Sequence, residues 1–267
     1  MLKDITLGQY FPGNSIAHKL DPRTKILLVT LYIIALFSAK GWMGYAVMAV
    51  TLAACVKVSH VGLRALVRGL KPLVFIIAFT GILNMFFTPD THYLWEWGIL
   101  RVSVKGIENA LFMVIRIMLL VMGTFLMTYT TSPIRLTDGL ESLLNPLKKI
   151  HVPVHELAMM MAIALRFIPT LIEETDKIMS AQKARGADFD SGNIFQKAKA
   201  LVPILVPLFI SAFRRADELA TAMECRCYHG GEGRTKLHVL KYQRRDYVAL
   251  AGGVVILALV VVLRRLG

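Results

Sequence analysis

The chain is 267 residues long, 55% of its residues are hydrophobic, and its mean hydropathy is +0.57. This composition excludes most classes of soluble domain and favours a membrane protein. The net charge of +13 comes without basic residues interleaved among aromatic ones, so we expect no nucleic-acid binding. Lysines and arginines stand beside apolar segments instead, as they do around membrane spans.

The first long apolar run predicts a hairpin of two membrane spans. Ile26–Val56 is apolar except for a break at residues 38–42, "SAKGW". As one straight helix the run would measure about 46 Å, against a hydrocarbon core of about 30 Å. We expect Lys25 and Lys57 to extend the two short spans by snorkelling towards the interface.

Three further spans are predicted over residues 72–87, 110–129 and 247–263. The aromatic residues between the third and fourth spans suit the outer membrane interface, as a short amphipathic piece. Arg116 lies inside the fourth span, and we expect its side chain to snorkel outward. The segments before the first span and after the second are both basic, which predicts that both are cytoplasmic.

The segment at residues 131–246 is long, carries charges of both signs and has a helical pattern. A first helix is predicted to start at Pro133 with Ser132 as its cap, and a second helix runs from Pro153 to about Ala184. A third is predicted from about Val202 to Cys225, with a bend near Pro207.

Together these patterns predict an all-α polytopic membrane protein with about five transmembrane helices. Residues 1–130 form a membrane domain of four spans, residues 131–246 a helical cytoplasmic domain with three main helices, and residues 247–267 contain the fifth span. We expect the N-terminus and the 131–246 domain to be cytoplasmic. The three cysteines, Cys55, Cys225 and Cys227, form no disulfide framework and suit a reducing compartment.

Both long helices of the 131–246 domain end at an arginine between two small residues. The two triplets are Ala184-Arg185-Gly186 and Cys225-Arg226-Cys227, and they stand 41 positions apart. A small residue can end a helix, and an arginine complements the negative end of the helix dipole. Small neighbours also let a helix end enter a groove, where a guanidinium makes forked hydrogen bonds. The spacing alone leaves capping and docking open.

Cys225, Cys227 and His229 are metal-ligating residue types that lie close together in the sequence. Helical positions two apart point about 200° away from each other, and no fourth ligand cluster follows. We therefore expect no metal in this chain.

Four stretches of the chain resemble the T component, the transmembrane scaffold of energy-coupling-factor (ECF) transporters. They are "HKLDPRTK" (18–25), "LRFIPTLIEET" (165–175), "AQKARGAD" (181–188) and "RRADELATAMECRCY" (214–228). The first triplet matches the family's Ala-Arg-Gly motif in full. In the second, cysteines replace the alanine and the glycine, while the small size of the side chains is kept.

The resemblance implies a role and a set of partners. The 131–246 domain would be a coupling domain whose residues Ala184, Arg185, Gly186, Cys225, Arg226 and Cys227 dock onto two ABC-type ATPase subunits. Those subunits would bind ATP, so the chain itself needs no cofactor and no catalytic residue. It would pass their motion to a substrate-binding S component that takes up a vitamin or another micronutrient across a bacterial cell membrane.

Two other classes of function stay open. The chain has no Gly-x-x-x-x-Gly-Lys-Ser/Thr phosphate loop, so its energy would have to come from elsewhere. A self-contained secondary transporter or channel with a regulatory insert would need charged or broken spans, and the spans offer little beyond Arg116 and Asn84. A membrane enzyme is motivated only by the two thiols and His229.

Overall fold

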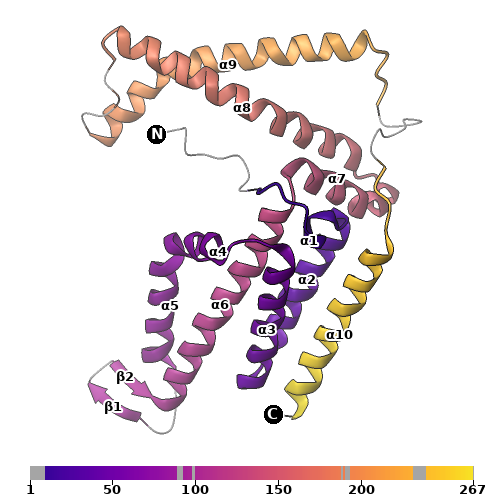
Figure 1. Ribbon diagram of the computed structural model, residues 1–267. Helices are drawn as coiled ribbons and strands as arrows, with labels where there is room; N and C mark the ends of the chain where they lie inside the picture. The colour runs from indigo at the N-terminus through magenta and orange to yellow at the C-terminus, as the bar shows by residue number, and fades with distance from the viewer. Residues whose placement is uncertain are drawn as a thin grey trace. The chain divides into compact units, whose positions relative to one another are not determined.

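The computed structural model describes residues 10–88, 93–97, 100–187, 189, 193–230 and 239–266. The described residues divide into two units. We call those within 8–142 and 240–267 the membrane unit, and those within 143–239 the arm unit. The predicted all-α polytopic class is confirmed, since the described strands are limited to one short hairpin (Figure 1).

The membrane unit holds most of the helices. They are α1 (Ile16–Lys19), α2 (Pro22–Ser38), α3 (Gly41–Ser59), α4 (Leu63–Leu70), α5 (Val74–Phe87), α6 (Val104–Thr130) and α10 (Arg244–Leu266), with a 3-10 turn, η2 (Lys71–Leu73), between α4 and α5. The amphipathic piece expected between the third and fourth spans is an antiparallel hairpin of β1 (Tyr93–Trp97) and β2 (Leu100–Ser103).

The arm unit consists of a short turn and two long helices. Helix α7 (Pro133–Leu144) leads into it and is followed by the 3-10 helix η3 (Asn145–Ile150), α8 (Val154–Ala184) and α9 (Ile194–Glu224). Helix α9 starts eight residues before the predicted Val202. Asn193 and Gln196 form a capping box there, which fixes the helix start ahead of Pro203 and Pro207.

Five helical segments are long and apolar enough to cross a membrane: α3, the α4–α5 segment (Leu63–Phe87), α6, α8 and Arg244–Arg265 of α10. The number of candidate spans agrees with the prediction, but the helices that form them are not all the predicted ones. Helix α2 has 17 residues, which span about 26 Å, at the lower end of the length that can cross a bilayer, so the predicted first span stays a prediction. Helix α8 qualifies by length and composition, although the sequence pattern assigned it to the cytoplasmic domain.

The core of the membrane unit lies where α2, α3, α6 and α10 pack together. Its most buried members include Leu36, Met48 and Val260, each with 0% exposure. Gly123 brings α6 close to α2: a Cβ at this position would lie 2.5 Å from Tyr32 Cε1. The Tyr32 hydroxyl also donates to the carbonyl of Leu119, at 3.0 Å.

Arg116 has its polar partner inside the helix bundle. Its Nε and Nη2 both donate to the hydroxyl of Tyr45 on α3, at 2.9 and 2.6 Å. Tyr45 is 3% exposed and stacks on Phe112, so the guanidinium is held against the protein. An intramembrane arginine can meet its need for a polar partner within the bundle, and here the partner comes from a helix 71 positions away along the chain.

Residues at the start of α2 contact both segments through which the chain leaves and re-enters the membrane unit. Asp21 caps α2 and Pro22 occupies its first turn. The carboxylate of Asp246, which is 1% exposed, accepts from the backbone N–H groups of Asp21 (2.9 Å) and Gln243 (2.7 Å). Arg23 Nη1 donates to Ser142 Oγ at 3.2 Å. We call these contacts the junction.

Lys25 belongs to the same region and does not snorkel. It is 6% exposed, and its Nζ donates to the carbonyl of Thr130 (2.8 Å) and to Thr131 Oγ1 (3.0 Å). A buried ammonium needs such acceptors, and these lie more than a hundred positions along the chain. The last turn of α6 is thereby fixed to the start of α2.

Candidate functional site

The end of α8 has the geometry of a Schellman motif, a common helix stop. The N–H of Gly186 donates to the carbonyl of Lys183 (3.0 Å), and that of Ala187 reaches back to Gln182 (3.0 Å). Gly186 has φ +88°, in the left-handed region that glycine adopts without strain. Arg185 is the residue directly before this turn.

The end of α9 is built in the same way, 41 positions later. The N–H of Cys227 donates to the carbonyl of Glu224 (2.8 Å), and that of Tyr228 to Met223 (3.1 Å). Cys227 has φ +55°, so a cysteine takes the place that glycine has in the first motif. The helix ends at Glu224, next to the predicted Cys225, and the left-handed turn is at Cys227, ahead of Gly230. Arg226 therefore occupies the same position in its motif as Arg185 does in the first.

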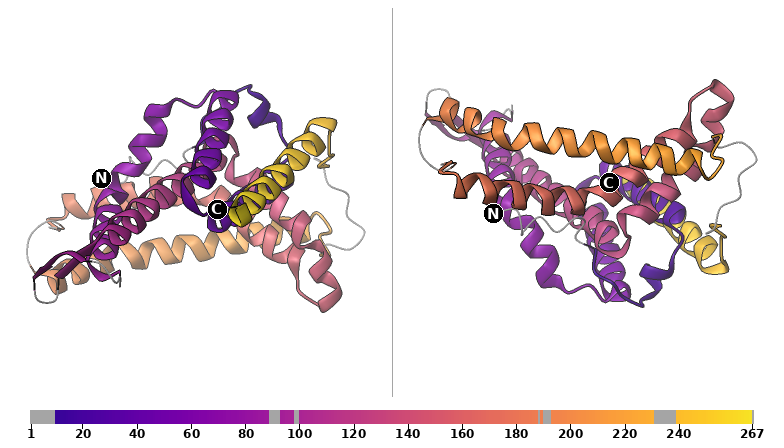
Figure 2. Two further views of the ribbon diagram at one scale, coloured as in Figure 1. Left: turned by 90° about the horizontal axis from the view of Figure 1, so that it is seen from below. Right: turned by 90° about the horizontal axis from the view of Figure 1, so that it is seen from above.

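The two arginine-tipped ends lie at opposite ends of the helix pair, because α8 and α9 run antiparallel. Near the end of α8, Gln182 Nε2 contacts the carbonyl of Pro203, close to the start of α9 (3.4 Å). Near the start of α8, Met159 Sδ accepts from the hydroxyl of Tyr228, just beyond α9 (3.1 Å). In the views of Figure 2 the two helices lie side by side.

Between these contacts, a polar cluster joins the middle of the pair. Glu174 on α8 accepts from Arg215 Nη2 at 2.8 Å and from the hydroxyl of Ser211, both on α9. The arginine side chain is 36% exposed and the glutamate 23%, so the ion pair stabilises the contact only modestly.

All six predicted docking residues are exposed, and they form two separate groups rather than one site. Ala184, Arg185 and Gly186 project beyond α8, and a Cβ added at Gly186 would meet no atom within 4 Å. Cys225 and Cys227 are free thiols. In the described part of the chain, no carboxylate or carbonyl contacts the guanidinium of Arg185 or Arg226. Both arginines thus keep all their side-chain donors available.

Helix α9 also exposes a long apolar face. Ile204 is 4% exposed, but many large apolar side chains of α9 are open: Phe195, Leu201, Val202, Leu205, Val206, Phe209, Ile210 and Phe213. An apolar groove of about 490 Å³ lies between α8 and α9, and Met223 and Tyr228 beside the second triplet help to line it. Exposed apolar surface of this extent marks an interaction site.

Among the described residues there is no cluster of three His, Cys, Asp or Glu side chains that could hold a metal ion.

Comparison with known proteins places this architecture in a family. Residues 13–237 match the model of the family described as "CbiQ: Cobalt transport protein". The chain belongs to the CbiQ/EcfT family.

Relatives in this family cover the chain almost end to end, and each is named energy-coupling factor transporter transmembrane protein EcfT. The protein of Acidaminococcus fermentans is 56% identical over 98% of this chain and 97% of its own length. That of Ruminiclostridium cellulolyticum is 52% identical over 98% of both chains, and that of Bacillus subtilis 46% over 99% of this chain and 100% of its own. A CbiQ/EcfT member is a transmembrane subunit of a transporter, which is a non-enzymatic role.

Proposed function

We propose that this chain is the scaffold of an ECF-type importer that couples two ATPase subunits to a substrate-binding S component. One observation carries the proposal: two helix ends with the same Schellman geometry present free arginines at opposite ends of one antiparallel pair. Each end fits one copy of a paired partner. ATP is bound by the partner subunits, and this chain supplies no catalytic group.

The exposed face of α9 supports the second half of the proposal. Its open phenylalanine, leucine, isoleucine and valine side chains would be costly in water. A membrane-embedded S component offers apolar surface that could cover them. The transported molecule, a vitamin or another micronutrient, would then be recognised by the S component. In this arrangement the arm unit and the N-terminus lie on the cytoplasmic side of a bacterial cell membrane, where ATP is available.

Charge reversal at the two arginines tests the docking role. Arg185→Glu and Arg226→Glu should each weaken retention of the ATPase subunits in the affinity-purified complex by about 30-fold or more, since a central interface arginine contributes at least about 2 kcal/mol. ATP-driven uptake in reconstituted vesicles should fall in parallel. Lys183→Glu and Arg214→Glu are the matched controls, because they reverse exposed charges on the same two helices.

A second pair of variants separates docking from general electrostatics. Arg185→Lys and Arg226→Lys keep the charge but lose the planar fork, so retention should still decrease if the guanidinium makes paired hydrogen bonds. If both charge reversals left ATPase retention and uptake unchanged, the docking role would be refuted. Transport by the purified chain alone in vesicles would favour the secondary transporter instead.

A further inference from the structure

Helix α4 has three different faces, of which only one is covered by the protein. Leu66 and Leu70 are 0% and 5% exposed and pack towards α6. Leu63 and Val67, 65% and 59% exposed, form a second, apolar face.

The third face of α4 is cationic. Arg64, Arg68 and Lys71, spaced four and three residues apart, lie along one side of the helix and are all exposed. None of the three forms an ion pair with a described residue. The sequence from Pro22 to Thr88 contains no aspartate or glutamate, so α4 and the helices on either side of it in the chain offer no acid to neutralise them.

The short connection between α4 and α5 indicates how deep α4 lies in the membrane. Lys71 and Pro72 lie in the short turn η2, and the apolar helix α5 starts at Val74. Figure 1 shows α4 turned across the end of α5. Because α4 is turned across the end of the apolar helix α5 and does not continue it, we place α4 at the boundary between the acyl chains and the headgroups.

Close packing holds α4 in this place. Gly69 lets the helix approach α6 so closely that a Cβ there would lie 2.6 Å from Phe125 Cε2. The hydroxyl of Tyr129 donates to the carbonyl of Ala65 at 3.3 Å. The cationic face is therefore presented by a fixed helix.

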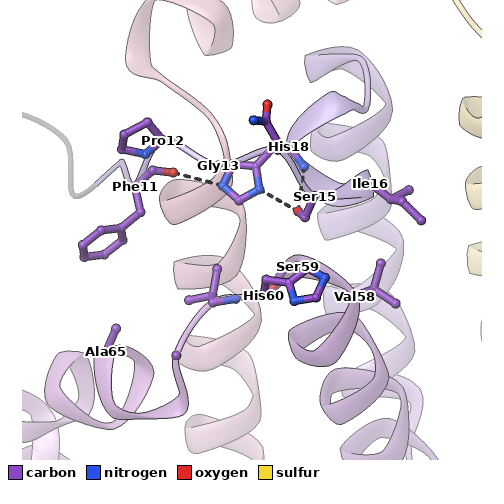
Figure 3. A pocket seen from close by; sticks show the side chains of 13 residues that line it. Phe11, Pro12, Gly13, Ser15, Ile16, His18, Val58, Ser59, His60 and Ala65 are labelled. Carbon is purple, nitrogen blue, oxygen red and sulfur yellow. Dashed lines mark hydrogen bonds between the residues drawn. The ribbon is translucent and has the colours of Figure 1, made fainter.

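Apolar surface continues from α4 into a groove of about 780 Å³ in the membrane unit (Figure 3). Ala65 and the α3–α4 turn line one side of it, and residues 11–16 line the other. His18 stabilises the second wall: its Nδ1 is 2.6 Å from Ser15 Oγ and its Nε2 is 3.0 Å from the carbonyl oxygen of Phe11. Phe11 and Ile16 in that wall are more than half exposed.

We propose that α4 is a membrane-surface helix that binds anionic phospholipid. Arg64, Arg68 and Lys71 contact the headgroup phosphates, while Leu63 and Val67 insert between the acyl chains. Charge complementarity selects the occupant: three unpaired cations at headgroup depth attract anionic lipid by about 1 kcal/mol each. The apolar face beside them favours a lipid over a soluble phosphate.

Competitive lipid binding to the full-length chain tests this proposal. The purified chain is mixed with equal amounts of phosphatidylglycerol and phosphatidylcholine, and the bound lipids are counted by native mass spectrometry. Phosphatidylglycerol should be preferred, and the variant Arg64→Gln/Arg68→Gln/Lys71→Gln should lose selectivity by about fivefold for each cation removed. The control Lys148→Gln/Lys149→Gln/Lys183→Gln removes the same charge from exposed positions of the arm unit and should keep the preference.

Three results would overturn the proposal. They are no phosphatidylglycerol preference in the wild type, an equal loss of selectivity in the control variant, and displacement of the lipid by soluble glycerol phosphate at the same concentration.

A second measurement does not depend on the folding of the triple variant. Nitroxide labels are placed at Val67→Cys or Arg68→Cys after the native cysteines have been replaced by serine. Oxygen, which concentrates in lipid, should increase the spin relaxation rate of the label at 67. A water-soluble nickel complex should increase that of the label at 68. If both labels respond as water-exposed, α4 does not lie in the interface and the proposal is wrong.

Discussion

The junction gives the sharpest quantitative prediction. In Asp246→Ala, the buried N–H of Asp21 and the more exposed N–H of Gln243 lose the carboxylate that now accepts from them at 2.9 and 2.7 Å. A hydrogen bond to a charged group contributes about 1.5–3 kcal/mol, so the two together should stabilise the junction by roughly 3–5 kcal/mol. Asp246→Asn keeps one acceptor oxygen and should lose about half of this.

Hydrogen exchange measures the loss of stability directly at the two amides. A loss of about 3 kcal/mol should increase the exchange rate of the two amides by roughly 100-fold or more, if they exchange by local opening. Peptides containing Asp21 and Gln243 report on it in detergent or in nanodiscs. Asp217→Ala, which removes an exposed acid on α9, is the control and should leave both peptides unchanged. If exchange of these two amides in Asp246→Ala matched the wild type, the reasoning about the buried carboxylate would be refuted.

Three other predictions concern Cys227, Gly123 and the ion pair between Glu174 and Arg215. Cys227→Gly should stabilise the end of α9 by about 1 kcal/mol, since it removes a left-handed non-glycine residue; slower amide exchange at residues 224–228 would show this, and faster exchange would contradict it. Gly123→Ala should lower the unfolding temperature through overpacking that costs about 1–3 kcal/mol, whereas Gly252→Ala, where a Cβ meets no atom within 4 Å, should not; equal effects would argue against the close approach of α6. A double-mutant cycle with Glu174→Gln and Arg215→Met should give a coupling energy of about 0.5–1 kcal/mol in chemical unfolding, and zero coupling would mean that the ion pair does not stabilise the contact between α8 and α9.

Local sequence signals were sufficient for much of the architecture. The Asp21-Pro22 start of α2 and the limits of α8 follow from capping and hydrophobic periodicity, which act within a few residues. The two arginine triplets could also be located at helix ends from the sequence. That they dock onto ATPases stays a prediction, and so do the limits of the three domains.

Some features could not be predicted from the sequence. In these cases the hydrogen-bond partner lies far away along the chain, or two ways of ending a helix are close in energy. Nothing beside Lys25 in the sequence shows that Thr130 and Thr131 will accept from it, so snorkelling was the natural expectation. The acceptor of Arg116, the Tyr45 hydroxyl, also belongs to another helix, so the sequence around Arg116 gives no sign of this contact. At Cys227 the local rule favoured a later glycine, but repeating the hydrogen-bond pattern of a Schellman motif outweighs a cost of about 1 kcal/mol.

The polar cluster between α8 and α9 has a mechanical consequence. Glu174 stands eleven positions before Arg185, and Arg215 stands eleven positions before Arg226. Each stretch corresponds to about 16 Å of helix, and neither contains a proline, since the helix-interior prolines lie on the far side of the cluster. The two helix segments that join the cluster to the arginine tips are therefore equal in length. A rotation of the pair by about 10° about the cluster would displace both tips by the same distance, about 3 Å.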